Sequence, residues 1–347
     1  MHKRFETGFR IGVATVVIAA VAAIAVSSAS AVPAAVAIPV TVLGGQGLPG
    51  GIQPLVQVRV GRSPRVSVIL DTGSSGLHIF ANAVATGPAS GVTVTAAPAN
   101  ITYAGGHRFI GVVAAATITI GAQPTAHATP FALVQHAVCI PSKPTCPAAG
   151  GISGFERQGI YGILGIGTAT SKGPVASPIL DMPGSLGRTW SLHLAGKGGT
   201  LVLGADVPSP SSSVATIPMR RTGSWGAHAL WADDALRLCT TVGTVEDCTP
   251  TLFDSGTAAF QLWGPTFEHV PKSSPTRVTS GTPVALSLHG ARVPFWSFVA
   301  GSARSKDLVV VRGGTGPFVN VGVQGYFDFT ITYDDVTGVV VLSHAAH

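Results

Sequence analysis

One short motif occurs twice in this chain, and each copy follows a run of apolar residues. The first copy is Asp71-Thr72-Gly73-Ser74 and the second is Asp254-Ser255-Gly256-Thr257, so the two aspartates are 183 positions apart. The runs at 66–70 and 251–253 predict that each aspartate stands at the end of a β-strand, and the glycine permits the tight turn that follows. We therefore expect two related halves, each presenting one strand-end carboxylate.

A weaker repeat supports this duplication. The first motif is followed by the apolar segment 161–165 and the second by the segment 317–322, and both segments end in glycine. We predict that each segment lies beside the aspartate-bearing turn of its own half. Glycine at the end would let the two backbones approach closely.

The composition predicts a chain built mostly of β-strands. Its 347 residues include 44 Gly and 25 Pro, and 46% of them are hydrophobic. Short Val, Ile, Thr and Leu runs separated by Gly and Pro are typical of strands and turns, and the length suffices for two packed lobes. The strands expected in the first half are 36–43, 55–60, 65–70, 76–80, 92–96, 100–103, 109–120 and 131–138. A loop is expected at 141–154, and the halves should meet between 182 and 197.

The charge pattern argues against nucleic acid as a partner. The formal net charge is +6, but Lys and Arg are scattered singly and are not interleaved with aromatic residues. Nucleic-acid-binding proteins gather these residues into patches. The sequence also lacks the H-E-x-x-H, G-x-S-x-G and P-loop motifs, and its histidines have no metal-ligand spacing. We expect no cofactor, no metal and no oligomeric partner.

The first 31 residues have the pattern of a targeting segment. Basic residues near the start precede an apolar stretch at 11–26, and small residues follow up to Ala31. This pattern predicts a signal peptide over 1–31 and therefore a secreted or cell-surface protein. The alternative is an uncleaved anchor that would hold the chain at the membrane or cell wall, although 16 residues are short for a span.

Export would place the four cysteines in an oxidising compartment. Cys139 and Cys146 are seven positions apart, and Cys239 and Cys248 are nine apart. Local pairing is the favoured one of three pairings, and each bond would stabilise the fold by about 2–3 kcal/mol. A zinc site built from all four cysteines is the alternative, but the C-x-x-C spacing is missing.

Two carboxyl groups from different halves could form an acid–base pair. Carboxylates about 3 Å apart repel each other by about 5 kcal/mol at an effective dielectric near 20, or about four pK units. One group therefore stays protonated while the other is ionised. The ionised group can take a proton from water while the protonated one polarises a carbonyl, so Asp71 and Asp254 are the candidate catalytic residues.

The residues after each aspartate have the properties that such a pair needs. Gly73 and Gly256 permit close approach of the two turns. The hydroxyls of Thr72 and Ser255 can form hydrogen bonds across the junction between the halves, and those of Ser74 and Thr257 can bond the outer carboxylate oxygens. We predict that these six residues support the site.

The chain resembles the pepsin-like aspartic proteases over nearly the whole sequence that follows the targeting segment. The segments that carry the resemblance are the two aspartate turns, the flap-like 101–106, the glycine-ended 162–167, and 190–194, 199–204 and 326–342. The resemblance implies an all-β, bilobal fold with pseudo-twofold symmetry, with lobes at 38–190 and 191–347. It also implies an extended polypeptide substrate in the central cleft, with Tyr103 and Gly105 in the flap that closes over it.

The Gly/Ala-rich style and the Asp-Ser-Gly turn are similar to bacterial relatives, the mycobacterial aspartic proteases that process PE-domain proteins. Three features differ from the family pattern. His78 replaces the usual tryptophan and is expected either to hydrogen-bond Tyr103 or to face solvent. The interval from Asp254 to Gly322 is 68 residues against 94 from Asp71 to Gly165, so the second lobe looks trimmed. Little chain separates Ala31 from the first strand, which leaves no room for a basic prosegment.

The sequence is compatible with two functions. The first is an active, secreted or surface-held aspartic endopeptidase that cleaves between apolar residues. The second is a catalytically silent binding or inhibitor protein of the cell envelope built on the same scaffold. Silent members of such families commonly lose an aspartate or a turn glycine, and both turns are intact here, which favours activity.

Overall fold

The computed structural model describes residues 35–44, 51–169, 175–302 and 306–345. The expected targeting segment at 1–31 lies outside these residues. Among the described residues, we find no helix with the length and apolar character needed to span a membrane. The described residues belong to one compact unit.

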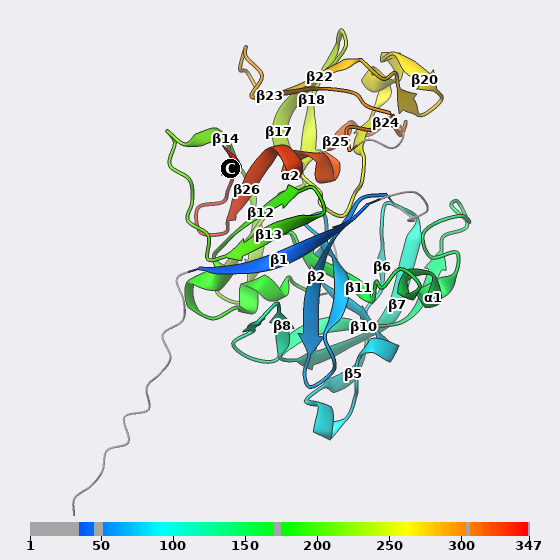
Figure 1. Cartoon of the computed structure of the whole chain (residues 1–347), viewed down its shortest axis with the longest axis vertical. Coiled ribbons are helices and arrows are strands. Elements are labelled where there is room, and N and C mark those ends of the chain that lie inside the picture. The colour runs from blue at the N-terminus through cyan, green and yellow to red at the C-terminus, as the bar shows by residue number, and fades with distance from the viewer. Residues whose placement is uncertain (1–34, 45–50, 170–174, 303–305, 346–347) are drawn as a thin grey trace, which may run out of the picture. The chain divides into compact units, whose positions relative to one another are not determined.

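The larger of two extensive sheets joins strands from both halves of the sequence. Strands β26, β12, β13 and β1 lie side by side in it (Figure 1). Its main path runs through β14 (Ser213–Pro218), β27 (Val339–His344), β26 (Phe329–Asp334), β12 (Thr189–Ala195), β13 (Gly198–Leu203), β1 (Val36–Leu43), β2 (Gln53–Val60), β3 (Val66–Asp71), β11 (Gly162–Ile166), β4 (Ser75–Phe80), β10 (Thr129–Cys139), β7 (His107–Ala116) and β5 (Thr93–Pro98). Attached beside this path are β6 (Ile101–Thr102), β8 (Ile118–Ile120) and β9 (Gln123–Pro124).

The second sheet is built entirely from the second half of the chain. Its order is β20 (Lys272–Ser274), β21 (Arg277–Val278), β24 (Val309–Val311), β19 (Phe260–Trp263), β25 (Phe318–Asn320), β18 (Val245–Leu252), β17 (Leu236–Val242), β22 (Pro283–Leu288) and β23 (Trp296–Val299). A separate hairpin pairs β15 (Arg221–Trp225) with β16 (His228–Trp231). The described α-helices are short, α1 (Gly151–Glu156) and α2 (Gly325–Asp328).

The same four-strand pattern surrounds both aspartates. In the first half, β11 runs parallel to β3 and antiparallel to β4, and β4 runs parallel to β10. In the second half, β25 runs parallel to β18 and antiparallel to β19, and β19 runs parallel to β24. The predicted duplication is therefore confirmed at the level of strand pairing.

The two glycines that end the repeated segments lie where close approach was predicted. A Cβ added to Gly165 would be 2.7 Å from the backbone of Ser74, and one added to Gly322 would be 2.5 Å from the carbonyl of Ala259. Ser74 and Ala259 both follow the aspartate of their own half. A side chain at either glycine would therefore push strand and turn apart.

Most expected strands appear with small shifts of their ends, and a few local expectations were wrong. The expected strand 109–120 is two strands, β7 and β8, which separate at Thr117. The expected loop 141–154 ends in α1, because the chain turns helical at Gly151. The proposed lobe boundary at 190/191 falls inside β12, a strand of the larger sheet, and stays a prediction.

Both locally favoured disulfides are present. Cys139 is bonded to Cys146, and Cys239 to Cys248. The second bond joins directly opposed positions on β17 and β18 rather than two loop residues. These bonds remove the thiolates that a zinc site built from the four cysteines would need.

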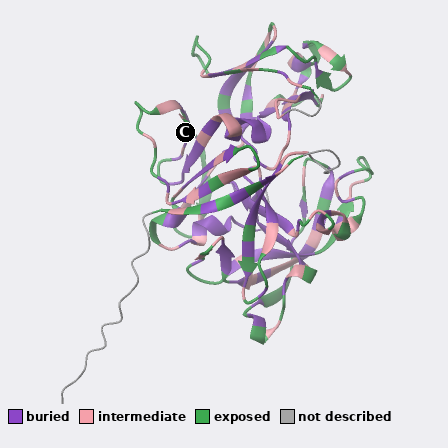
Figure 2. Ribbon diagram, in the orientation of Figure 1, coloured by how far each residue is buried: buried purple, intermediate pink, exposed green. Residues whose placement is uncertain are grey.

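The core follows the inward faces of the strands, while exposed residues gather in loops and hairpin tips (Figure 2). Trp190, Tyr326 and Tyr333 are among its largest fully buried side chains. The ring of Trp190 stacks on that of Tyr333 with centroids 5.8 Å apart. Burying one large apolar side chain contributes about 1.5–3 kcal/mol, so this layer holds the strands that carry the site in place.

Candidate active site

The two aspartate-bearing turns hold their carboxyl groups in the same way. Asp71 is the last residue of β3, and its Oδ1 and Oδ2 accept hydrogen bonds from the Gly73 N–H (2.7 Å) and the Ser74 hydroxyl (2.5 Å). Asp254 follows β18, and its Oδ1 accepts from the Gly256 N–H at 2.9 Å. The Thr257 hydroxyl donates to Asp254 Oδ2 at 2.8 Å. Each short turn therefore fixes its own carboxylate.

Reciprocal hydrogen bonds lock the two turns together. The Thr72 N–H donates to Ser255 Oγ at 3.0 Å, and the Ser255 N–H donates to Thr72 Oγ1 at 2.9 Å. Each hydroxyl then donates onward, Thr72 to the Phe253 carbonyl (2.8 Å) and Ser255 to the Leu70 carbonyl (2.7 Å). All four bonds are buried, where an unpaired partner would be costly, so the turns are tightly fixed relative to each other.

Glycine at the third position lets each carboxyl group reach the opposite turn. A Cβ on Gly73 would collide with the carboxyl group of Asp254, and one on Gly256 would be 2.5 Å from Asp71 Oδ1. The two carboxyl groups therefore lie close enough for the charge of Asp254 to raise the pKa of Asp71. The structure thus brings together the six support residues and the two aspartates that the sequence singled out.

The pair is nearly sealed from solvent, since Asp71 is 6% and Asp254 is 8% exposed. Burial raises the pKa of the Asp71 carboxyl to about 8, and the nearby charge of Asp254 adds to the shift. The hydrogen bonds from Ser74 and Gly73 act in the opposite direction but do not overcome it. Burial and the neighbouring carboxyl group therefore both favour the protonated form of Asp71.

Asn320 is a site residue that the sequence reading missed. Its side-chain amide donates to Asp254 Oδ2 at 2.6 Å, and its Oδ1 accepts from the Gly322 N–H at 2.8 Å. Asn320 pairs with Leu252 on β18, in the way that Ile163 pairs with Ile69 on β3. A polar residue inside an otherwise apolar strand was the available signal.

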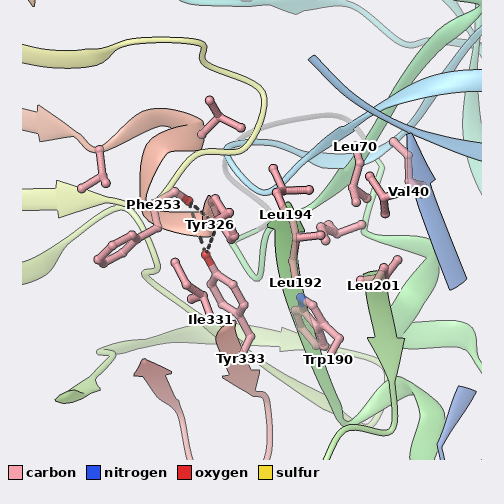
Figure 3. Close-up of a cluster of buried hydrophobic side chains, with 14 of the residues drawn as sticks. Val40, Leu70, Trp190, Leu192, Leu194, Leu201, Phe253, Tyr326, Ile331 and Tyr333 are labelled. Atoms are coloured by element: carbon pink, nitrogen blue, oxygen red, sulfur yellow. Dashed lines mark hydrogen bonds between the residues drawn. The ribbon is translucent and has the colours of Figure 1, made fainter. Parts of the chain in front are cut away.

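Two buried tyrosines join the interlocked turns to the core. The Tyr326 hydroxyl is 2.8 Å from Thr72 Oγ1 and 2.8 Å from the Tyr333 hydroxyl, and both tyrosines also reach the Phe253 carbonyl (Figure 3). The Tyr333 hydroxyl can donate to Tyr326, the Tyr326 hydroxyl to Thr72, and the Thr72 hydroxyl to the Phe253 carbonyl. Each hydroxyl proton in this series then has an acceptor. No sequence pattern predicted this series of hydrogen-bonded hydroxyl groups.

The flap-like segment lies over the first aspartate turn. Tyr103 and Gly105 sit at the tip of the hairpin formed by β6 and β7, closed by hydrogen bonds between Tyr103 and both Gly106 and His107. Burial holds the pKa of the Tyr103 hydroxyl well above the usual range, and the charge of the nearby Asp71 adds to the shift. The hairpin therefore approaches Asp71.

Both sequence-based expectations for His78 were wrong. The side chain is fully buried, and its ring meets that of Tyr103 edge-on at a centroid distance of 6.1 Å without a hydrogen bond. His78 pairs with Ala132 on β10 and with Ile163 on β11, so strands cover it on both sides. This central position in the sheet excludes contact with solvent.

Among the described residues, one group of side chains has the residue types of a metal site, Cys239, Glu246 and Cys248. Its two cysteines are bonded to each other, so they offer no thiolate ligands. It does not fit a metal centre.

Comparisons with known proteins agree with this geometry. A search of curated proteins found no match. Among solved structures, the aspartic proteinase from Irpex lacteus is similar with a TM-score of 0.60 and 16% identity, over 90% of this chain and 98% of that one. This likeness confirms the expected all-β, bilobal, pepsin-like fold. A family model, the PE-PGRS C-terminal aspartyl peptidase-like domain, matches residues 36–328, and because it covers most of the chain, the protein belongs to that family.

Proposed function

We propose that this protein is an aspartic endopeptidase that hydrolyses peptide bonds with a water molecule activated between Asp71 and Asp254. The observation that carries the proposal is the buried pair of carboxyl groups, which matched turns hold close to each other. Loss of either aspartate or of a turn glycine would be expected in a silent binding protein, and the chain retains all of them.

The surroundings of the two carboxyl groups suggest a division of roles. Asp254 accepts three hydrogen bonds, from Gly256, Thr257 and Asn320, which stabilise a negative charge. Asp71 accepts two, and its raised pKa favours the protonated form. In the resting pair Asp254 is therefore the base and Asp71 the acid.

The reaction then follows from proton positions. Asp254 removes a proton from the water as its oxygen attacks the scissile carbonyl carbon, and Asp71 gives its proton to the carbonyl oxygen. The tetrahedral intermediate collapses when the C–N bond breaks and the nitrogen leaves with the proton that Asp254 had taken. Deprotonation of the gem-diol hydroxyl returns a proton to Asp71, so the pair is restored without a covalent intermediate.

We further propose that the substrate is an extended polypeptide with apolar residues on both sides of the cleaved bond, bound beneath the β6–β7 hairpin. The two disulfides support an exported protein, secreted or held at the cell surface, because such bonds persist in oxidising compartments. A monomeric form is sufficient for this chemistry, since both aspartates come from one chain.

Incubation of the purified chain with a peptide library in mildly acidic buffer tests the proposal. We expect cleavage that a statine-type inhibitor stops, and none with Asp71→Asn or Asp254→Asn. Binding of the inhibitor without any cleavage across the pH range would instead identify the silent binding protein. Cleavage that persists in both single variants would remove the pair from the mechanism.

A further inference from the structure

Five buried polar atoms without a hydrogen-bond partner gather beneath the flap-like hairpin. They are both ring nitrogens of His78, both ring nitrogens of His107 and the Tyr103 hydroxyl, half of the ten such atoms among the described residues. Buried polar groups are nearly always paired, so a concentration of unpaired ones at one place calls for a functional explanation.

The three side chains form one packed cluster, which we call the His–Tyr–His cluster. The ring of His107 lies flat on that of Tyr103, with centroids 4.5 Å apart and planes 13° apart. The ring of His78 meets Tyr103 from another side, edge-on. Phe109 and Phe155 close the cluster with further ring contacts, so its surroundings are apolar.

Backbone bonds fix the outer side of the hairpin but not the position of the tyrosine ring. The Gly106 carbonyl accepts from the Ile140 N–H at 2.8 Å, and the Ala104 carbonyl accepts from Lys143 Nζ at 2.6 Å. On the inner side, the ring contacts of Tyr103 are those with His78, His107 and Phe109. The two imidazoles, together with Phe109, therefore pack around the Tyr103 ring and hold it in place.

Few charges could support a protonated imidazole in this place. Burial alone lowers the pKa of His107 to about 4. Burial also lowers the pKa of His78 to about 4, and the Gly76 backbone acts in the opposite direction without overcoming it. The other titratable or charged groups on the elements packed around the cluster are Arg59, which is exposed, and Asp71, Arg108, His136, Lys143, Glu156, Arg157 and Tyr161.

None of these groups forms a hydrogen bond or ion pair with either imidazole. Lys143 is bound to the Ala104 carbonyl, and Glu156 accepts a hydrogen bond from Asn82. Arg108, His136 and Arg157 are exposed. A proton on either imidazole would therefore place an uncompensated charge inside an apolar cluster.

We propose that His78 and His107 are positioning residues that hold Tyr103 over the Asp71 turn only while both imidazoles are neutral. This inference rests on the proposed peptidase function and adds an acid-sensitive control of the flap. As the pH falls below about 4, each imidazole takes up a proton and the cluster opens. One pH unit lower, the neutral fraction of each ring is about one tenth, so the peptidase rate should fall about tenfold for each histidine.

The test compares wild type with the double variant His78→Phe/His107→Phe, which keeps the ring packing but cannot titrate. His136→Phe is the matched control, because His136 is an exposed histidine on β10. Two readouts are followed from pH 7 to pH 3. One is kcat/KM on a peptide substrate. The other is hydrogen exchange at the amides of Tyr103, Gly106 and Ile140, corrected for intrinsic exchange.

We expect wild type and the control to lose flap protection and peptidase rate together below pH 4. The double variant should keep the protection of its flap amides from hydrogen exchange. Its kcat/KM should also fall less steeply than that of wild type as the pH decreases. An acid limb and an exchange profile identical in wild type and double variant would overturn the inference. If no form cleaves peptide, the proposed function fails, but the exchange profiles still decide the role of the histidines.

A direct titration covers the case in which the double variant does not fold. The ring signals of His78 and His107 can be followed by NMR in the wild-type protein and assigned with the single variants. Midpoints near 4, accompanied by a shift of the Tyr103 ring signals, support the proposal. Midpoints near the ordinary value of about 6.5 would refute it.

Discussion

The two aspartate turns have almost the same local geometry but different neighbours. Both turns use an N–H and a hydroxyl to hold their carboxylate, and both pack against a glycine at or just beyond the end of a parallel strand. Only the second turn receives a further donor, Asn320, where the first half has the apolar Ile163. Only the first turn lies under an aromatic hairpin. Duplication thus supplies a matched scaffold, and single residues beside it make the two carboxyl groups chemically unequal.

The largest expected effect comes from removing either carboxyl group. Asp71→Asn and Asp254→Asn should each lower kcat by about 10⁴-fold, because each removes one of the two proton-transfer steps. Turnover of a peptide substrate measures this, with circular dichroism as the check that both variants are folded. A variant that keeps more than a tenth of the wild-type rate would show that its carboxyl group is dispensable.

The pH dependence of folding stability should show whether Asp71 carries the proton in the folded protein. The pKa of Asp71 is raised on folding, so the folded state holds a proton that the unfolded state loses. Stability should therefore fall as the pH rises from about 4 towards about 8, and Asp71→Asn should flatten this slope. Urea unfolding at several pH values measures the slope. A stability that instead rises through this range in wild type, with no change in Asp71→Asn, would place the proton elsewhere.

The hairpin over the first turn should have the next largest effect. Tyr103→Ala removes the ring that lies over Asp71, and loss of precise substrate placement should lower kcat/KM by about 10²-fold. Tyr103→Phe is the control, because it keeps the ring contacts with His78 and His107. A wild-type rate for Tyr103→Ala would mean that the flap is misassigned.

Replacing Asn320 by the residue of the first half tests the asymmetry itself. A hydrogen bond to a charged group is worth about 1.5–3 kcal/mol, so Asn320→Ile should lower kcat on a peptide substrate by about tenfold or more. Ile163→Val, a conservative change at the matching position, should leave kcat unchanged. A wild-type kcat in Asn320→Ile would remove Asn320 from the division of roles.

The smallest expected effect concerns the tyrosine chain that joins both turns. Tyr326→Phe removes a hydroxyl that contacts Thr72 of one turn and the Phe253 carbonyl beside the other. We expect a loss of unfolding free energy of about 1–2 kcal/mol, measured by urea denaturation. Tyr333→Phe should have a weaker effect, since its hydroxyl reaches the turns mainly through Tyr326. Equal losses of unfolding free energy in the two variants would show that the linked hydroxyl groups act as one unit.

The sequence by itself determined the elements that depend on local pattern. Apolar runs broken by glycine and proline specified most of the strands, and the repeated Asp-Thr/Ser-Gly turns specified where two carboxyl groups would meet. Short spacing was enough to pair the cysteines correctly, because a nearby partner needs little loop closure. These features depend on neighbours within a few positions, and the sequence displays such neighbours directly.

Only the tertiary structure decided which distant side chains complete the site. The contacts of Asn320 with Asp254 and of Tyr326 with Thr72 cross 66 and 254 positions. His78 becomes buried because two strands from later in the chain flank it. Strand register and packing set such contacts, and a change of one residue in register would turn these side chains to the other face of the sheet. For that physical reason the sequence indicated the pair, while the fold determined what makes its two members unequal.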